Sequence, residues 1–165
     1  MNSKVRIGQG YDVHAFGAGN HVTLGGEKIP YSAGVQAHSD GDVLLHALCD
    51  ALLGAMGLGD IGMHFPDTDP QWRGADSRVF LRHVAQLLSM RRYAVVNVDV
   101  TVLAEAPRLG SYRQQMCANI ATDLNIGIDQ VNIKATTTER LGFIGRGEGL
   151  ACQAIVLIES IVDRS

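Results

Sequence analysis

Apolar residues follow two different spacings along the chain, and these spacings predict strands and helices in separate segments. Residues 5–13 alternate imperfectly between apolar and polar side chains, and residues 94–104 carry alternating β-branched side chains, as is typical of strands. Residues 22–24 and Ile29 flank Gly25 and Gly26, which indicates a short hairpin. Two further strands are predicted over residues 130–137 and 149–161.

Helical spacing predicts three helices. Ser39 and Asp42 precede a long apolar stretch and resemble a capping box, which predicts a helix over residues 40–56. This segment is apolar on nearly every side, so we expect it to be buried. Asp76 is expected to cap a second helix over residues 76–91, and a third is predicted over 111–124. The Gly- and Pro-rich residues 57–75 between the first two helices predict a long loop, and loops of this length are often functional.

The predicted order of elements is β-β-α-α-β-α-β-β, and no repeat or linker divides it, so residues 1–165 are expected to form one α/β-type domain. The apolar content of 46% excludes disorder, and no run of 18 apolar residues predicts a membrane span. The net charge of −3 is unlike that of proteins that bind nucleic acid or acidic membranes. An anionic substrate would therefore need metal ions or backbone N–H groups to compensate its charge.

Cysteine usage and the N-terminal residues favour the cytoplasm. Cys49, Cys117 and Cys152 are odd in number, lack a CxxC spacing and stand among apolar residues, so we interpret them as buried thiols in a reducing compartment. The first fifteen residues contain no apolar signal-peptide core, so no secretory signal is expected.

Asp12 and His14 are the first candidates for chemistry. Residues two apart on a strand point to the same face, so a carboxylate and an imidazole would lie side by side there. The pair could form half of a zinc site, but the spacing alone favours a hydrogen-bonded surface pair.

Asp42, His46 and Asp50 form a polar stripe on the otherwise apolar first helix, because positions four apart share a face. Such a stripe indicates either a structural hydrogen-bond network or a metal ligand. His46 with Asp12 and His14 would give three zinc ligands and an open fourth position, as in catalytic zinc sites. The sequence alone does not place His46 beside the strand.

Residues 134–149 place three threonines at the end of a strand, ahead of a glycine-rich loop. Their hydroxyl and backbone donors would suit phosphate oxygens, and Glu139 could hold a hard cation such as Mg²⁺. An ordinary strand followed by a turn explains the same pattern. At residues 104–108, Pro107 is typical of a helix start and Arg108 could contact a phosphate or only water.

Six motifs in fixed order together resemble the family of 2-C-methyl-D-erythritol 2,4-cyclodiphosphate synthases. They are GxGxDxH at 8–14, AHSDGDVLLHALCDALLGA at 37–55, GDIGxxFPDTDP at 59–70, ADSR at 75–78, NVDVT at 97–101 and KATTTERLGFIGRGEG at 134–149. The resemblance covers residues 5–158. It implies an α+β, two-layer fold with a mixed, mainly antiparallel sheet covered by helices on one side. It also implies a homotrimer whose sheets pack about a threefold axis, with active sites between subunits.

The resemblance implies a reaction as well. The 2-phosphate of 4-diphosphocytidyl-2-C-methyl-D-erythritol 2-phosphate would attack the β-phosphorus, giving the cyclic diphosphate and CMP, a phosphorus-oxygen lyase reaction. Zn²⁺ would be held by Asp12, His14 and His46, and Mg²⁺ or Mn²⁺, bridging the α and β phosphates, by Glu139. A zinc-dependent phosphoesterase and a non-catalytic trimeric nucleotide-binding module are the alternatives.

Further residues are assigned to the site by the resemblance. His38 and Thr137 would stabilise the transition state, with Ser39 and Thr136 at the phosphates. The methylerythritol portion would contact Asp60, Ile61, Gly62, Phe65, Pro66, Asp67, Thr68 and Asp69. The cytosine pocket would be formed by Ala104, Glu105, Ala106, Pro107, Arg108, Leu109 and Gly110. Other substrate contacts would come from Asp12, Val13, His14, Thr138, Glu139, Phe143 and Arg146.

Two residues differ from those found in part of the family. Gln9 stands where some members have His, and Glu105 stands where some have Gln, so an inward-pointing Glu105 would weaken nucleotide binding.

The chain has 19 glycines, many of them in 8–10, 57–62 and 142–149. We expect these segments to bring the backbone close to phosphates and to neighbouring subunits.

Overall fold

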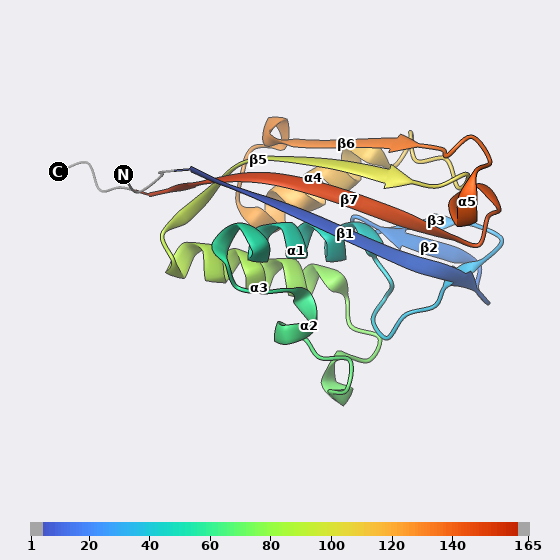
Figure 1. Cartoon of the computed structure of the whole chain (residues 1–165), viewed down its shortest axis with the longest axis horizontal. Helices are drawn as coiled ribbons and strands as arrows, with labels where there is room; N and C mark the ends of the chain where they lie inside the picture. Colours follow the sequence, from blue (N-terminus) through green and yellow to red (C-terminus); the bar gives the residue numbers. More distant parts are fainter. Residues whose placement is uncertain (1–4, 162–165) are drawn as a thin grey trace.

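The computed structural model describes residues 5–161 and contains a five-stranded mixed sheet in the order β4-β1-β7-β5-β6 (Figure 1). Its strands are β1 (Val5–Gly17), β4 (Gly34–Val35), β5 (Tyr93–Leu103), β6 (Val131–Thr136) and β7 (Gly149–Ser160). Only β5 and β6 pair in parallel, and the other neighbours are antiparallel. A separate hairpin is formed by β2 (His21–Leu24) and β3 (Glu27–Pro30), as its Gly-Gly turn predicts.

Three long helices cover one face of the sheet. These are α1 (Val43–Met56), α3 (Ser77–Met90) and α4 (Arg113–Leu124), with the short elements α2 (Ile61–His64), η1 (Pro70–Trp72), η2 (Ile128–Gln130) and α5 (Gly142–Gly145) between the main ones. Helix α1 packs on β1 and β7, α4 on β6, and α3 on α1, α4 and β5. The α+β architecture with helices on one side, expected from the resemblance, is confirmed.

The strand pattern explains why only one face is covered. In β7 the residues at even positions from 150 to 158 are buried, and so are their β5 partners. On β1 the partners Gly8 and Gly10 are buried, while Asp12 and His14 are half-buried. On the opposite face Ile7, Tyr11, Val13 and Ile155 stay exposed. An apolar sheet face without a covering layer is typical of a contact surface.

Helix α1 begins later than the sequence indicated. Asp42 is its N-cap and accepts a hydrogen bond from the Leu45 backbone N–H, so the helix starts at Val43 rather than at residue 40, and Ser39 is not the cap. Its burial is confirmed, since eleven of its residues are buried. The predicted loop 57–75 also contains the short elements α2 and η1. Cys49, Cys117 and Cys152 are free and buried, as expected.

The glycines of β1 have a packing role. A Cβ on Gly8 would lie 1.8 Å from the Ala51 carbonyl oxygen, and one on Gly10 would lie 1.9 Å from that of Ala47. The expectation that segment 8–10 approaches phosphates is therefore wrong for these two glycines, since what approaches them is helix α1.

Among residues 5–161, no helix has the length and apolar character needed to span a membrane.

Candidate metal centre and substrate cavity

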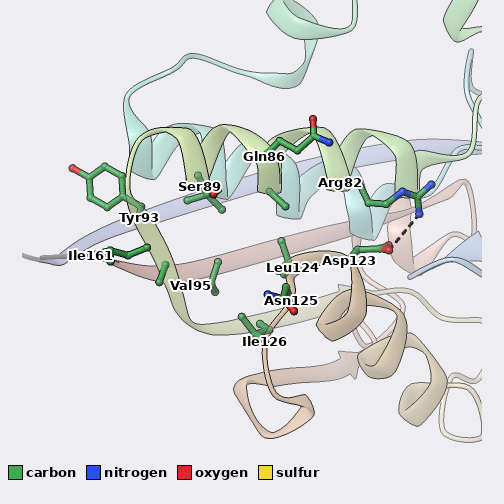
Figure 2. Close-up of a pocket in the computed structure, with 13 residues that line it drawn as sticks. Arg82, Gln86, Ser89, Tyr93, Val95, Asp123, Leu124, Asn125, Ile126 and Ile161 are labelled. Carbon is green, nitrogen blue, oxygen red and sulfur yellow. Dashed lines mark hydrogen bonds and ion pairs between the residues drawn. The ribbon is translucent and has the colours of Figure 1, made fainter. Parts of the chain in front are cut away.

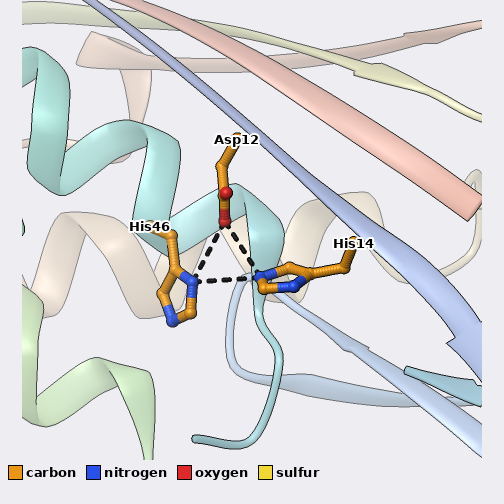
Figure 3. Close-up of side chains that lie close together, drawn as sticks. All are labelled: Asp12, His14 and His46. Carbon is orange, nitrogen blue, oxygen red and sulfur yellow. Dashed lines mark hydrogen bonds and ion pairs between the residues drawn. The ribbon is translucent and has the colours of Figure 1, made fainter. Parts of the chain in front are cut away.

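Asp12, His14 and His46 come together at one point between β1 and α1, as Figure 3 shows. The Asp12 Oδ2 atom lies 3.0 Å from His14 Nε2 and 3.1 Å from His46 Nδ1. The two imidazole nitrogens are 3.3 Å apart. All three candidate ligand atoms lie within 4.8 Å of one another, so a single divalent ion can contact all of them.

The local structure explains why these side chains meet. Asp12 and His14 stand two apart on β1 and share the face that receives α1, as predicted. His46 is one turn into α1, directly before Ala47, whose carbonyl oxygen packs against Gly10. The close approach that the glycines allow thus brings the helix ligand to the strand ligands.

The electrostatics of the three groups are those of a cation site. Burial opposes ionisation of Asp12, but hydrogen bonds and charge from His14 and His46 hold the pKa of its carboxyl well below its usual range. Burial disfavours the His46 imidazolium, yet the hydrogen bond to Asp12 and the charges of neighbouring carboxylates raise its pKa. A carboxylate that stays ionised and attracts positive charge is a fitting metal ligand. One oxygen and two nitrogens suit a tetrahedral ion such as Zn²⁺ with its fourth position open.

The polar stripe on α1 divides into two roles. Asp42 is fully buried and accepts hydrogen bonds from the backbone N–H groups of Gly25, Gly26 and Leu45, so it ties the hairpin turn to the helix start. Asp50 accepts a hydrogen bond from the Ile61 N–H and holds α2. The structural-network interpretation is therefore right for these two carboxylates. Of the three stripe residues, His46 alone lies with the candidate ligands.

A cavity of about 230 Å³ opens beside the three ligands. Its lining includes these residues that were assigned from the sequence: His14, His38, Ser39, His46, Ile61, Phe65 and Asp67. A neighbouring cavity of about 170 Å³ is lined by Thr68 and Asp69 and shares His38 and Asp67. The 57–75 segment thus forms one wall of the site. Asp60 lies at the start of α2, where its side chain accepts from the Met63 N–H.

Trp72 and Phe80 also line the cavity, and the sequence reasoning missed them. With Phe65 they form an aromatic cluster whose ring centroids are 4.5 to 5.6 Å apart. The only signal available was that Trp72 is the single tryptophan and stands in the glycine-rich loop.

A larger cavity of about 470 Å³ lies between α3, α4 and β5 and contains none of the assigned site residues (Figure 2).

The threonine-rich segment lies away from the metal ligands within one chain. Thr136 ends β6, and β6 is separated from β1 by β5 and β7, which amounts to three strand spacings, or about 14 Å. The residues from Thr136 to Glu139 do not line the cavity beside the ligands. Glu139 and Arg140 both have positive φ, of 53° and 63°, so this turn holds two non-glycine residues in the left-handed region.

Glu105 turns toward that segment. One of its carboxylate oxygens lies 3.0 Å from the Thr138 backbone N–H, 3.3 Å from the Thr138 hydroxyl and 3.3 Å from the Arg140 N–H. Its charge therefore fixes the 138–140 turn, and the 104–110 loop is linked to the 136–140 segment. Arg146 pairs with Glu148 on the surface.

The strand order, the single helix-covered face and the open three-ligand site together describe one class of protein. Residues 5–159 match the model of the YgbB family, which identifies that class. This chain belongs to that family. It is 61% identical, over 96% of its length and 99% of the relative, to 2-C-methyl-D-erythritol 2,4-cyclodiphosphate synthase of Thioalkalivibrio sulfidiphilus. It is 61% identical to the enzyme of the same name from Stutzerimonas stutzeri, over 93% of this chain and 98% of the relative. The family resemblance read from the motifs is confirmed.

Solved structures agree with this assignment. The chain is similar to a structure described as IspF of Plasmodium falciparum in complex with CDP, with a TM-score of 0.86 and 37% identity over 98% of this chain and 100% of the other. It also matches the bifunctional IspDF of Campylobacter jejuni, with a TM-score of 0.91 and 43% identity over 95% of this chain. This chain spans 42% of that bifunctional protein's length.

Proposed function

We propose that this chain converts 4-diphosphocytidyl-2-C-methyl-D-erythritol 2-phosphate to 2-C-methyl-D-erythritol 2,4-cyclodiphosphate and CMP. The observation that carries the proposal is the convergence of Asp12, His14 and His46 beside an open cavity, in a chain whose relatives bear the name of this synthase. An oxygen of the 2-phosphate attacks the β-phosphorus, and the bond from that phosphorus to the bridging oxygen breaks. CMP leaves with the bridging oxygen, which makes the enzyme a phosphorus-oxygen lyase acting as a single domain over residues 1–165.

The chain's own residues mainly position the substrate and stabilise charge, which is what phosphoryl transfer requires. Asp12, His14 and His46 would hold Zn²⁺, and the ion would supply Lewis-acid polarisation to the diphosphate. His38 stabilises the transferring group, and in support its exposed side chain lines the cavity beside the candidate metal ligands. Thr137, Thr136 and Ser39 donate hydroxyl hydrogen bonds to phosphate oxygens.

The remaining assigned residues bind the two ends of the substrate. Methylerythritol contacts come from the wall formed by residues 60–69, whose Ile61, Phe65 and Asp67 line the cavity. The cytosine contacts residues 104–110, and Val13, Thr138, Phe143 and Arg146 complete the set. Glu139 would hold a second divalent cation, Mg²⁺ or Mn²⁺, which would supply positive charge to the diphosphate. The chemistry of a carboxylate suits such a hard ion.

We place each active site between two subunits of a homotrimer. The two phosphates of a diphosphate are only a few ångströms apart, whereas the β1 and β6 strands of one chain are three strand spacings apart. A site that uses both His46 and Glu139 is therefore most simply built from two chains. The exposed apolar face with Ile7, Tyr11, Val13 and Ile155 offers the surface on which sheets would pack about a threefold axis.

Metal content and products test the proposed reaction. Purified protein should contain one zinc per subunit, and His46→Ala should lose both zinc and turnover while its circular dichroism stays unchanged. Product analysis should find CMP and the cyclic diphosphate. Free inorganic phosphate as the product would instead favour a phosphoesterase, and absence of stoichiometric zinc would favour a non-catalytic nucleotide-binding module. We expect the enzyme in the cytoplasm, in keeping with its buried free thiols.

A mixing experiment tests the shared site. His46→Ala and Glu139→Ala should each be inactive alone. If they are dissociated and reassembled together, about a quarter of the sites in random trimers combine an intact zinc half with an intact Glu139 half, so that fraction of activity should return. No recovery in trimers shown to be mixed would place the whole site within one chain.

A further inference from the structure

The ring nitrogen of His46 that faces away from the metal ligands has its own partners. Its Nε2 atom lies 2.9 Å from the Ser77 hydroxyl and 3.1 Å from the Ser39 hydroxyl. Ser77 is the first residue of α3 and is fully buried. Its hydroxyl lies 2.5 Å from one oxygen of Asp40, and the other oxygen of Asp40 accepts the Ser77 backbone N–H at 3.0 Å. A carboxylate, a hydroxyl and an imidazole therefore form a continuous chain behind the metal centre.

The hydrogen-bond chemistry gives this chain a direction. An ionised carboxylate only accepts, so the Ser77 hydroxyl donates its proton to Asp40. The lone pairs of that hydroxyl are then left to accept an N–H from His46 Nε2. With one proton held on Nε2, the other ring nitrogen, Nδ1, faces Asp12 and His14. Once Nδ1 has given up the proton that it shares with Asp12, its lone pair is free to bind a metal ion there.

We propose that Ser77 and Asp40 are positioning residues for the metal ligand His46, an inference that rests on the proposed zinc function. They fix its tautomer and the orientation of its ring. This gives a role to Ser77 of the ADSR motif at residues 75–78, which the proposed reaction does not use. Outer partners of this kind commonly change metal affinity 10- to 100-fold, because an unrestrained imidazole must be ordered each time it binds.

Ser77 is a better anchor than Ser39. Ser39 is only partly buried and lines the substrate cavity. Its hydroxyl oxygen accepts a hydrogen bond from the Gly41 backbone N–H at 3.3 Å. Its hydroxyl is therefore available to substrate. Ser77 is held by Asp40 at two points and lies inside the contact between α1 and α3.

Zinc affinity, measured by competition with a chelator, tests the inference on the full-length protein. Ser77→Ala should lower zinc affinity by about 10- to 100-fold relative to wild type. Ser77→Thr, which restores the hydroxyl, should recover most of the loss. Ser89→Ala removes a serine hydroxyl from the exposed far end of the same helix and should change nothing. Asp40→Asn should also weaken zinc binding, which keeps the inference testable if Ser77→Ala does not fold.

A spectroscopic readout separates positioning from general stability. In zinc-loaded protein labelled with ¹⁵N-histidine, the His46 Nε2 proton should exchange slowly with water in wild type and rapidly in Ser77→Ala. Zinc affinity of Ser77→Ala within twofold of wild type, with the same slow exchange, would overturn the inference and leave the proposed function standing. Failure of wild type itself to bind zinc would overturn the proposed function, and the inference with it.

Discussion

Gly10→Ala is the substitution that most directly tests how the metal centre is assembled. The added Cβ would lie 1.9 Å from the Ala47 carbonyl oxygen and 2.8 Å from the Ala51 nitrogen, both backbone atoms of α1. A carbon and a carbonyl oxygen approach no closer than about 3.3 Å, so the helix must retreat from β1 by about 1.4 Å. His46 precedes Ala47 on that helix and would move with it.

The cost follows from the packing. Overpacking a core costs about 1–3 kcal/mol, and here rigid backbone must shift, so we expect a loss of about 3 kcal/mol or more. For a chain of this length that corresponds to a fall in Tm of about 6–12 °C. Zinc affinity should fall as well, because a ligand displaced by an ångström no longer meets the other two.

Gly54→Ala is the matched control on the same helix. A Cβ there would lie no closer than 3.9 Å to the Gln9 carbonyl oxygen. Removing a helical glycine should raise stability by about 0.5–1 kcal/mol. Both variants should be unfolded by heat and by urea at one protein concentration, since assembly makes Tm concentration-dependent. A Gly10→Ala protein with wild-type Tm and wild-type zinc content would refute the reasoning.

Three further predictions concern the surroundings of the site. Arg78→Ala removes one of the arginine partners of Asp123, whose side chain is 3% exposed. The free energy of unfolding, measured with urea, should fall by about 2 kcal/mol, and a fall below about 0.5 kcal/mol would contradict this prediction. Glu105→Ala removes the acceptor of the Thr138 N–H and should weaken CDP binding, measured by calorimetry, about tenfold. The zinc content should stay unchanged. Stronger CDP binding would instead show that the Glu105 charge acts on the nucleotide. Zinc affinity should fall about tenfold per pH unit below the raised pKa of His46, because imidazolium does not bind metal; a flat profile between pH 7 and 5 would exclude His46 as a ligand.

The elements that the sequence predicted best are those with a regular spacing. Strands β5, β6 and β7 and helix α3 appear close to the predicted ranges, because alternation and helical repeats report directly on burial. Strand β1 begins where predicted but continues past the predicted end at residue 13 to Gly17. The start of α1 was misplaced, since Ser39 and Asp42 both match a cap and only the backbone decides between them. The short elements α2 and η1 were not foreseen, because four- and three-residue turns have no repeat to detect.

The sequence by itself determined which face of β1 carries Asp12 and His14, which residues are chemically able to bind a metal, and, through its ordered motifs, the family. Those properties depend on spacing within one element or on the order of residues in the chain. Only the tertiary structure decided that His46 reaches the strand while Asp42 and Asp50 do not, that Gly8 and Gly10 admit a helix, and that Glu105 turns away to hold a neighbouring turn. The physical reason is that spacing sets where a side chain points, whereas its partner depends on which surfaces pack together, and that is settled by contacts between residues far apart in the chain.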